Sequence, residues 1–193
     1  MAASFIPFFA VFLTLLVGAS LLISTALTGV PTLSSRRSEV DDIVALLKHA
    51  KLRKRALIVD LGSGWGALVI ALARAFPEAS VQGVEISLFP YLVSCLRTHH
   101  LPNVSLKWGN FFHSDPGSAN AVVCYLMPGV MAKLGDFLDK ALKPGTFIVT
   151  NTFLFRERRA AAVRRRGLRG TVALYIWPGR HWTVKDGDVS ARV

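Results

Sequence analysis

Short apolar runs alternate with amphipathic stretches between residues 38 and 177 of this 193-residue chain. Apolar runs without polar alternation are typical of strands that are buried on both faces of a parallel sheet. Apolar side chains that recur every three or four residues indicate amphipathic helices. The runs predict buried strands over residues 56–59 and 119–126, and residues 80–84, 104–108 and 146–150 are expected to form three further strands. The amphipathic stretches predict a helix capped by Ser38, with acidic residues in its first turn, and helices over residues 67–76, 88–100 and 131–142.

Strands that alternate with helices are connected by right-handed βαβ crossovers. The order of the predicted elements therefore indicates an α/β domain with a doubly wound, mostly parallel sheet. Residues 171–177 and 181–184 predict a closing antiparallel hairpin around the Pro178-Gly179 turn.

The N-terminal 35 residues carry no charged side chain. Residues 5–27 form an apolar stretch that would span about 34 Å as a helix, enough for a hydrocarbon core of about 30 Å. A cleaved signal peptide is the competing interpretation, but it would carry a basic start and a shorter apolar run. We therefore expect a transmembrane anchor with its linker over residues 1–35, bound to the bilayer through residues 5–27, and one domain over residues 36–193.

Composition and charge agree with that expectation. The chain is 52% hydrophobic and only 18% charged, which is too apolar for an ordinary soluble domain. Basic residues follow the apolar stretch and none precedes it, so the positive-inside rule places the domain on the cytoplasmic side of a single-pass membrane protein. Two cysteines, Cys95 and Cys124, argue against a disulfide scaffold. A bacterial inner membrane is the favoured location, with an organellar membrane as the alternative.

The C-terminal segment is strongly basic. Residues 151–193 hold ten basic and three acidic side chains, and seven arginines lie between Arg156 and Arg169. The small apolar residues among those arginines favour an exposed basic helix. The arginines could attract anionic lipid headgroups, form a solvated face or contact RNA. We favour the lipid interpretation and do not expect nucleic acid as a partner.

Candidate chemistry begins where the first predicted strand ends. Residues 60–66 read Asp-Leu-Gly-Ser-Gly-Trp-Gly and join that strand to the next helix. The glycines allow a tight turn and the close approach of a ligand to the backbone. Such a loop could hold a pyrophosphate, but the carboxylate of Asp60 would repel one. That carboxylate instead suits a ligand with a cationic amino group and a sulfonium centre.

Two further loops fit the same ligand. Glu85 ends the second predicted strand, and its carboxylate can accept both hydroxyls of a ribose at the edge where open α/β sheets bind ligands. Residues 109–112 (Gly-Asn-Phe-Phe) offer an amide for an adenine amino group and aromatic rings for its face. We therefore expect S-adenosyl-L-methionine as cofactor. The expected binding residues are Asp60, Gly62, Ser63, Gly64, Trp65, Gly66, Glu85, Ile86, Asn110 and Phe111.

The three motifs, in this order, resemble those of the class I, seven-strand S-adenosylmethionine-dependent methyltransferases. Residues 60–66 look like motif I, residues 83–87 like the acidic motif of strand two, and residues 109–112 like the adenine motif. The resemblance covers residues 40–177 and implies a Rossmann-like sheet of the seven-strand type. Asn110 departs from the pattern, because many relatives carry Asp there, but an amide keeps the hydrogen-bonding capacity.

A narrower resemblance is to a small family of membrane-anchored protein lysine methyltransferases. It is carried by the N-terminal apolar stretch, residues 60–64, Glu85 with residues 89–93, and residues 125–131. Mitochondrial members of that family modify lysines of the ATP synthase c-subunit and of the adenine nucleotide translocase. The resemblance implies a protein-lysine N-methyltransferase that acts on a membrane protein near the bilayer surface.

The fourth predicted strand bears on the acceptor. Enzymes that methylate base amines or glutamine amides usually carry an Asn/Asp-Pro-Pro-aromatic run here, whereas residues 124–129 read Cys-Tyr-Leu-Met-Pro-Gly. A lysine amine requires desolvation and alignment instead. Tyr125 and His113 are the candidate catalytic bases, although Tyr125 could equally form a wall of the pocket. No ligand cluster accompanies the neighbouring His99 and His100, so no metal site is expected.

Two alternatives to the lysine enzyme stay open. One is a lipid or quinone methyltransferase, because those acceptors also lie in membranes. The other is a non-catalytic, membrane-bound module that binds RNA or lipid with a methyltransferase fold. Intact acidic and glycine positions in the first two motifs argue against the second alternative.

Overall fold

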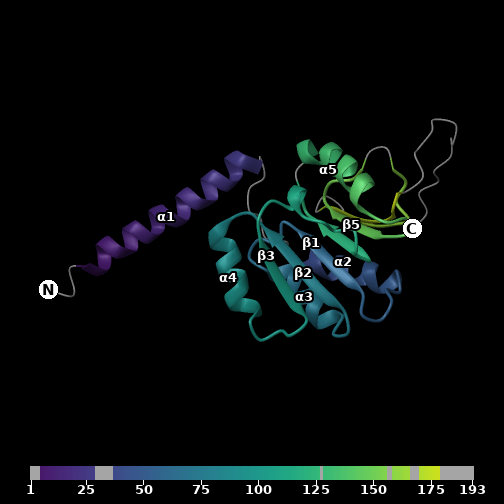
Figure 1. The fold of residues 1–193 in the computed structure, drawn as a ribbon, viewed down its shortest axis with the longest axis horizontal. Helices are drawn as coiled ribbons and strands as arrows, with labels where there is room; N and C mark the ends of the chain where they lie inside the picture. The colour runs from purple at the N-terminus through teal and green to yellow at the C-terminus, as the bar shows by residue number, and fades with distance from the viewer. Residues whose placement is uncertain (1–4, 29–36, 127, 156–157, 166–169, 179–193) are drawn as a thin grey trace.

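The computed structural model describes residues 5–28, 37–126, 128–155, 158–165 and 170–178. Within these ranges a long helix extends away from an α/β body (Figure 1). The helices are α1 (Phe5–Thr28), α2 (Arg37–His49), α3 (Ala67–Ala75), α4 (Leu88–Thr98) and α5 (Pro128–Ala141), with a 3-10 turn, η2 (Phe111–His113). The strands are β1 (Leu57–Leu61), β2 (Ser80–Glu85), β3 (Val104–Trp108), β4 (Ala121–Cys124), β5 (Phe147–Asn151), β6 (Ala162–Arg165) and β7 (Thr171–Ile176).

The seven strands form one sheet in the order β3-β2-β1-β4-β5-β7-β6. The first five strands are parallel to their neighbours, whereas β7 is antiparallel to both β5 and β6. The predicted doubly wound, mostly parallel, Rossmann-like sheet of seven strands is therefore confirmed. Because β2, β1, β4 and β5 are parallel neighbours, their carboxyl ends lie side by side along one edge.

The central strands of the sheet, β1 and β4 among them, are buried on both faces, as their apolar runs require. Ile58 of β1 packs into one cluster with side chains from α2 and α3, while its neighbour Val59 packs into a second cluster with side chains from α5. Both side chains are almost completely buried. Successive side chains of a strand point to opposite faces, so a strand covered by helices on both faces is apolar along most of its length.

The basic segment differs from its prediction. The exposed helix expected over residues 156–169 is replaced, in its described part, by the edge strand β6, which pairs with β7. Arg164 and Arg165 are exposed on this strand, and charged side chains are typical of sheet edges because they discourage pairing with other chains. The predicted strand over residues 171–177 is confirmed as β7, but its partners are β5 and β6. Residues 181–184 lie outside the described residues.

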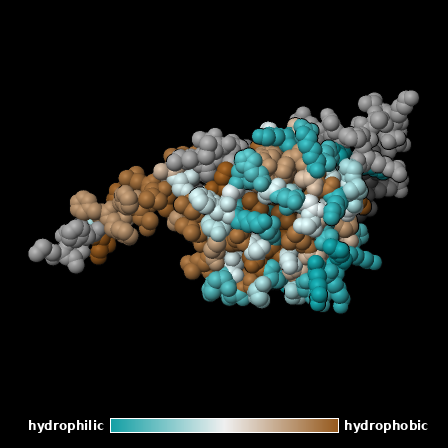
Figure 2. Space-filling model, in the orientation of Figure 1, coloured by the Kyte–Doolittle hydropathy of each residue, from teal (hydrophilic) through white to brown (hydrophobic). Residues whose placement is uncertain are grey.

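The predicted membrane anchor is contradicted. The exposed apolar side chains of α1 include Phe8 and Phe12, and Figure 2 shows this helix as a hydrophobic arm beside the body. Among the described residues, no helix is long and apolar enough to cross a membrane. The transmembrane anchor over residues 5–27 and the single-pass location inferred from it are therefore wrong.

Candidate active site

The glycine-rich loop lies between β1 and α3, as predicted. Its backbone N–H groups at Gly62 and Ser63 both donate to the carbonyl of Val84, at 2.9 and 3.0 Å, which fixes the loop against the end of β2. Gly64 and Gly66 have φ values of 52° and 78°, a left-handed conformation that a side chain disfavours.

Gly66 is also restricted by a close neighbour. A Cβ atom at this position would lie 2.3 Å from the Oγ of Ser94 on α4. The missing side chain therefore allows α4 to approach the start of α3. The helix α4 also contacts the loop through Trp65, whose ring meets that of Phe89 edge-to-face at 5.8 Å, and Arg97 donates to the Trp65 carbonyl at 2.6 Å. These contacts indicate packing of Trp65 beside the loop.

Glu85 connects the end of β2 to the glycine-rich loop by hydrogen bonds. It ends β2 and is buried, and its two carboxylate oxygens accept hydrogen bonds from the backbone N–H groups of Gly64 and Ser87, each at 2.7 Å. The structure thus brings Glu85 and the glycine-rich loop together, as the sequence motifs predicted. The next residue, Ile86, is half-buried, and its carbonyl accepts a hydrogen bond from the indole of Trp108 at 2.9 Å.

Asp60 supplies the main electrostatic feature of the site. Its carboxyl group is buried, and burial together with the nearby charge of Glu85 raises its pKa from 3.8 to about 7. A cation placed beside Asp60 would offset both effects. The Oγ of Ser63 is buried and lacks a hydrogen-bond partner among the described residues. A cationic, hydrogen-bonding ligand such as S-adenosyl-L-methionine therefore fits this set of residues.

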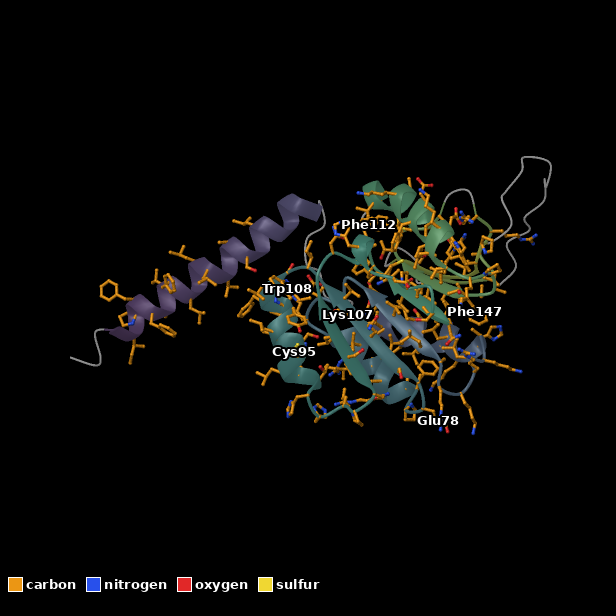
Figure 3. All side chains as sticks on the ribbon, viewed as in Figure 1. Glu78, Cys95, Lys107, Trp108, Phe112 and Phe147 are labelled. Carbon is orange, nitrogen blue, oxygen red and sulfur yellow. The ribbon has the colours of Figure 1, made fainter. Side chains whose placement is uncertain are left out.

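The predicted adenine loop follows β3 and is joined to Glu85. The backbone N–H of Gly109 donates to the Glu85 carbonyl at 2.8 Å. The side-chain oxygen of Asn110 accepts from the N–H of Phe112 at 3.0 Å and so caps η2. The rings of Phe111 and Phe112 lie 4.4 Å apart, and Phe112 extends toward α5, where it meets Phe137 (Figure 3).

The two candidate bases occupy different surroundings. Tyr125 directly follows β4 and is half-buried at the edge shared with the glycine-rich loop, whereas His113 is exposed at the end of η2. Their catalytic roles stay predictions. Cys124, one residue earlier, is buried next to Asp60, and burial raises its pKa to about 12, with the charge of Asp60 adding to the shift. Its thiol is therefore protonated and packs in the core, as expected.

Sequence reasoning missed a polar pair at the end of β5. The side-chain nitrogen of Asn151 donates to a carboxylate oxygen of Glu39, in the first turn of α2, at 3.1 Å. Asn151 is a polar residue at the end of a strand, as Glu85 is, and this position is the signal in the sequence that could have identified it. The partnership itself joins residues 112 positions apart, so no local pattern reveals it. Within the described ranges no group of His, Cys, Asp or Glu side chains could hold a metal ion.

Comparisons with known proteins agree with this geometry. The profile of a family described as "ANTKMT methyltransferase domain" matches residues 60–162, more than half of the chain. The chain is 31% identical over 137 residues to a protein-lysine N-methyltransferase of Saccharolobus islandicus (strain REY15A), covering 68% of this chain and 85% of that protein.

Nucleic-acid-modifying enzymes are also among the similar proteins. A tRNA (guanine-N(7)-)-methyltransferase of Candida glabrata is 27% identical over 154 residues, covering 70% of this chain and 51% of that protein. An RNA methyltransferase from Salinibacter ruber, solved with S-adenosyl-L-homocysteine, matches with a TM-score of 0.68 and 26% identity. That match covers 75% of this chain and 93% of the solved one.

The cofactor loop, the sheet order and the family match lead to one assignment. The motifs at the ends of β1, β2 and β3 lie together at one edge, and the matched family segment begins at Asp60. The chain belongs to the family of the ANTKMT methyltransferase domain and is a class I methyltransferase that uses S-adenosyl-L-methionine.

Proposed function

We propose that this enzyme methylates the amino group of lysine side chains in a protein substrate. The observation that carries the proposal is the 31% identity to the protein-lysine N-methyltransferase of Saccharolobus islandicus, over 85% of that protein. The apolar end of β4 supports it, because residues 124–126 offer no side-chain amide or carboxylate to hold a planar base or amide nitrogen.

The residues at the carboxyl edge of the sheet would have two roles. Asp60, Ser63 and Glu85 would hold the cofactor, which supplies an electrophilic methyl group when bound. Tyr125 and Leu126, directly after β4, would meet the acceptor nitrogen. That nitrogen must first lose one proton to solvent, because it needs a lone pair to bond the methyl carbon as the carbon–sulfur bond breaks. Apolar surroundings favour the neutral amine over the ammonium, and alignment lowers the barrier further.

RNA is the second candidate substrate. The similarity to the Salinibacter ruber RNA methyltransferase, which extends over 93% of that chain, favours it. Exposed Arg165 on β6 would suit a phosphate backbone, whereas its neighbour Arg164 pairs with Asp42 at 3.6 Å. The apolar end of β4 argues against this candidate for base amines.

One labelling experiment distinguishes the two candidates. Purified enzyme is incubated with cell extract and S-adenosylmethionine that carries a labelled methyl group, and label is followed into protein, RNA and lipid fractions. We expect acid-stable label in protein that peptide mapping places on lysine, and no label with the Asp60→Ala variant. Label that is removed by ribonuclease, or that maps to residues other than lysine, would contradict the proposal.

A further inference from the structure

The end of β5 belongs to the same edge as the cofactor loop. Leu61 of β1 is the register partner of Cys124 on β4, and Cys124 is the partner of Thr150 on β5. Neighbouring strands lie about 4.8 Å apart, so the end of β5 is roughly 10 Å from the end of β1 and roughly 5 Å from that of β4. Asn151, the last residue of β5, therefore lies level with Tyr125 on the side away from Glu85.

Asn151 is held in one orientation. Its side chain is 1% exposed, and its nitrogen donates to Glu39 at 3.1 Å while its oxygen accepts from the hydroxyl of Thr152 at 3.3 Å. The two contacts fix which end of the amide faces Glu39. The buried amide of Asn151 therefore holds the carboxylate of Glu39 in place.

The backbone beside Asn151 is strained. Thr152 has a φ of 70°, which is rare for a β-branched residue. The segment is secured by hydrogen bonds from the Thr152 N–H to the Thr171 carbonyl, at 2.8 Å, and from the Phe153 N–H to the Asn151 carbonyl, at 2.9 Å. Strained residues that are secured in this way concentrate at functional sites.

Glu39 completes the arrangement from a distant part of the chain. It is half-buried in the first turn of α2, which packs against β5 and β7. Asp60 and Glu85 lie on the cofactor side of β4, whereas Glu39 lies on the opposite side. The carboxylate of Glu39 would therefore contact a substrate group that reaches the end of β4 from the side of β5.

We propose that Glu39, held in place by Asn151, binds the ammonium group of the acceptor lysine and positions it beside the cofactor. This inference rests on the proposed lysine methyltransferase function. Glu39 accepts a hydrogen bond from the arriving ammonium and keeps one to the neutral amine that remains after a proton is lost to solvent, which leaves the nitrogen lone pair for the methyl carbon. Asn151 is a positioning residue that acts through Glu39. Charge-assisted hydrogen bonds of this kind are short and strong, so their loss raises the KM for lysine more than it lowers kcat.

The test uses the full chain and poly-L-lysine as a probe acceptor. In Glu39→Gln the side-chain oxygen still accepts from Asn151, so the contact between α2 and β5 is kept while the charge is lost. Glu78→Gln is the matched control, because Glu78 is exposed, pairs with Lys54 at 3.8 Å and lies far from the site (Figure 3). Thermal melting and calorimetric titration with S-adenosylmethionine accompany the kinetics for each variant.

We expect Glu39→Gln to melt and to bind S-adenosylmethionine like the parent, while its kcat/KM for poly-L-lysine falls about tenfold or more, mainly through KM. Glu39→Asp should recover part of that loss, and Glu78→Gln should behave like the parent. An unchanged KM in Glu39→Gln, or a loss that accompanies weaker cofactor binding, would overturn the inference alone. If the parent enzyme methylates neither poly-L-lysine nor any lysine in cell extract, the proposed function itself fails and the inference with it.

Discussion

Replacement of Asp60 by Asn tests the electrostatic account of the cofactor loop. In the folded protein without cofactor, burial and the neighbouring Glu85 raise the pKa of Asp60 from 3.8 to about 7. Between these two pH values the folded state keeps a proton that the unfolded state has lost. Stability therefore falls as the pH rises through this window and levels off above about pH 7.

The magnitude follows from the shift. One pKa unit corresponds to 1.36 kcal/mol, so the charged carboxylate destabilises the fold by on the order of 4 kcal/mol above pH 7. Asp60→Asn removes the ionisation and keeps the shape. We expect this variant to be more stable than the parent at pH 8 by a few kcal/mol, with the difference shrinking toward zero near pH 4.

Urea denaturation of the cofactor-free parent and variant from pH 4 to pH 8.5 measures this difference directly. Glu78→Gln serves as the control, because Glu78 is exposed and its replacement should leave the pH profile unchanged. The same Asp60→Asn protein should bind S-adenosylmethionine far more weakly than the parent in calorimetry, because the anion that faces the cationic ligand is gone. A variant that is less stable than the parent at pH 8, or that binds the cofactor equally well, would refute the reasoning.

Three further predictions concern packing around the site. Gly66→Ala should lower both stability and cofactor affinity, because its Cβ would lie 2.3 Å from the Ser94 Oγ at a φ of 78°; a variant that melts and titrates like the parent would contradict this. Cys124 should resist iodoacetamide at pH 8.5 in the folded protein, because its pKa is raised to about 12, whereas half-buried Cys95 should react; mass spectrometry of the labelled peptides decides between them. Leu134→Ala should reduce the free energy of unfolding by about 2–5 kcal/mol, because this side chain of α5 is fully buried in the cluster between the helix and the sheet; urea denaturation showing a loss well below 1 kcal/mol would refute it.

The sheet and the cofactor loops could be predicted because their signals are local. The runs that became β1 and β4 are mostly apolar because helices cover both faces, and each binding motif lies at or directly after the end of its strand. The edge strand β6 could not be predicted in this way. Its arginines face solvent, so no buried face imposes a period of two, and its hydrogen bonds are made to β7, a later segment.

The pair of Glu39 and Asn151 shows the same limit at the site. An acidic residue in the first turn of a helix has a sufficient local explanation in the helix dipole, and an Asn after a strand is common in turns. Only the packing of α2 against β5 and β7 brings the two side chains together. The N-terminal helix illustrates the opposite case, in which a strong local pattern predicted an element, α1, but the membrane crossing inferred from it is wrong.

The placement of the acidic residues connects the cofactor to the proposed acceptor. Both reactants of lysine methylation arrive as cations, and a single carboxylate could bind only one of them. Asp60 and Glu85 lie together on one side of the end of β4, whereas Glu39 lies on the other, bonded to Asn151 at the end of β5. The end of β4 itself carries no charged side chain from Cys124 to Leu126. Anions on both flanks attract the two cations, and the apolar centre opposes the preference of Glu39 for the charged amine, so that the nitrogen can lose its proton where the methyl group is transferred.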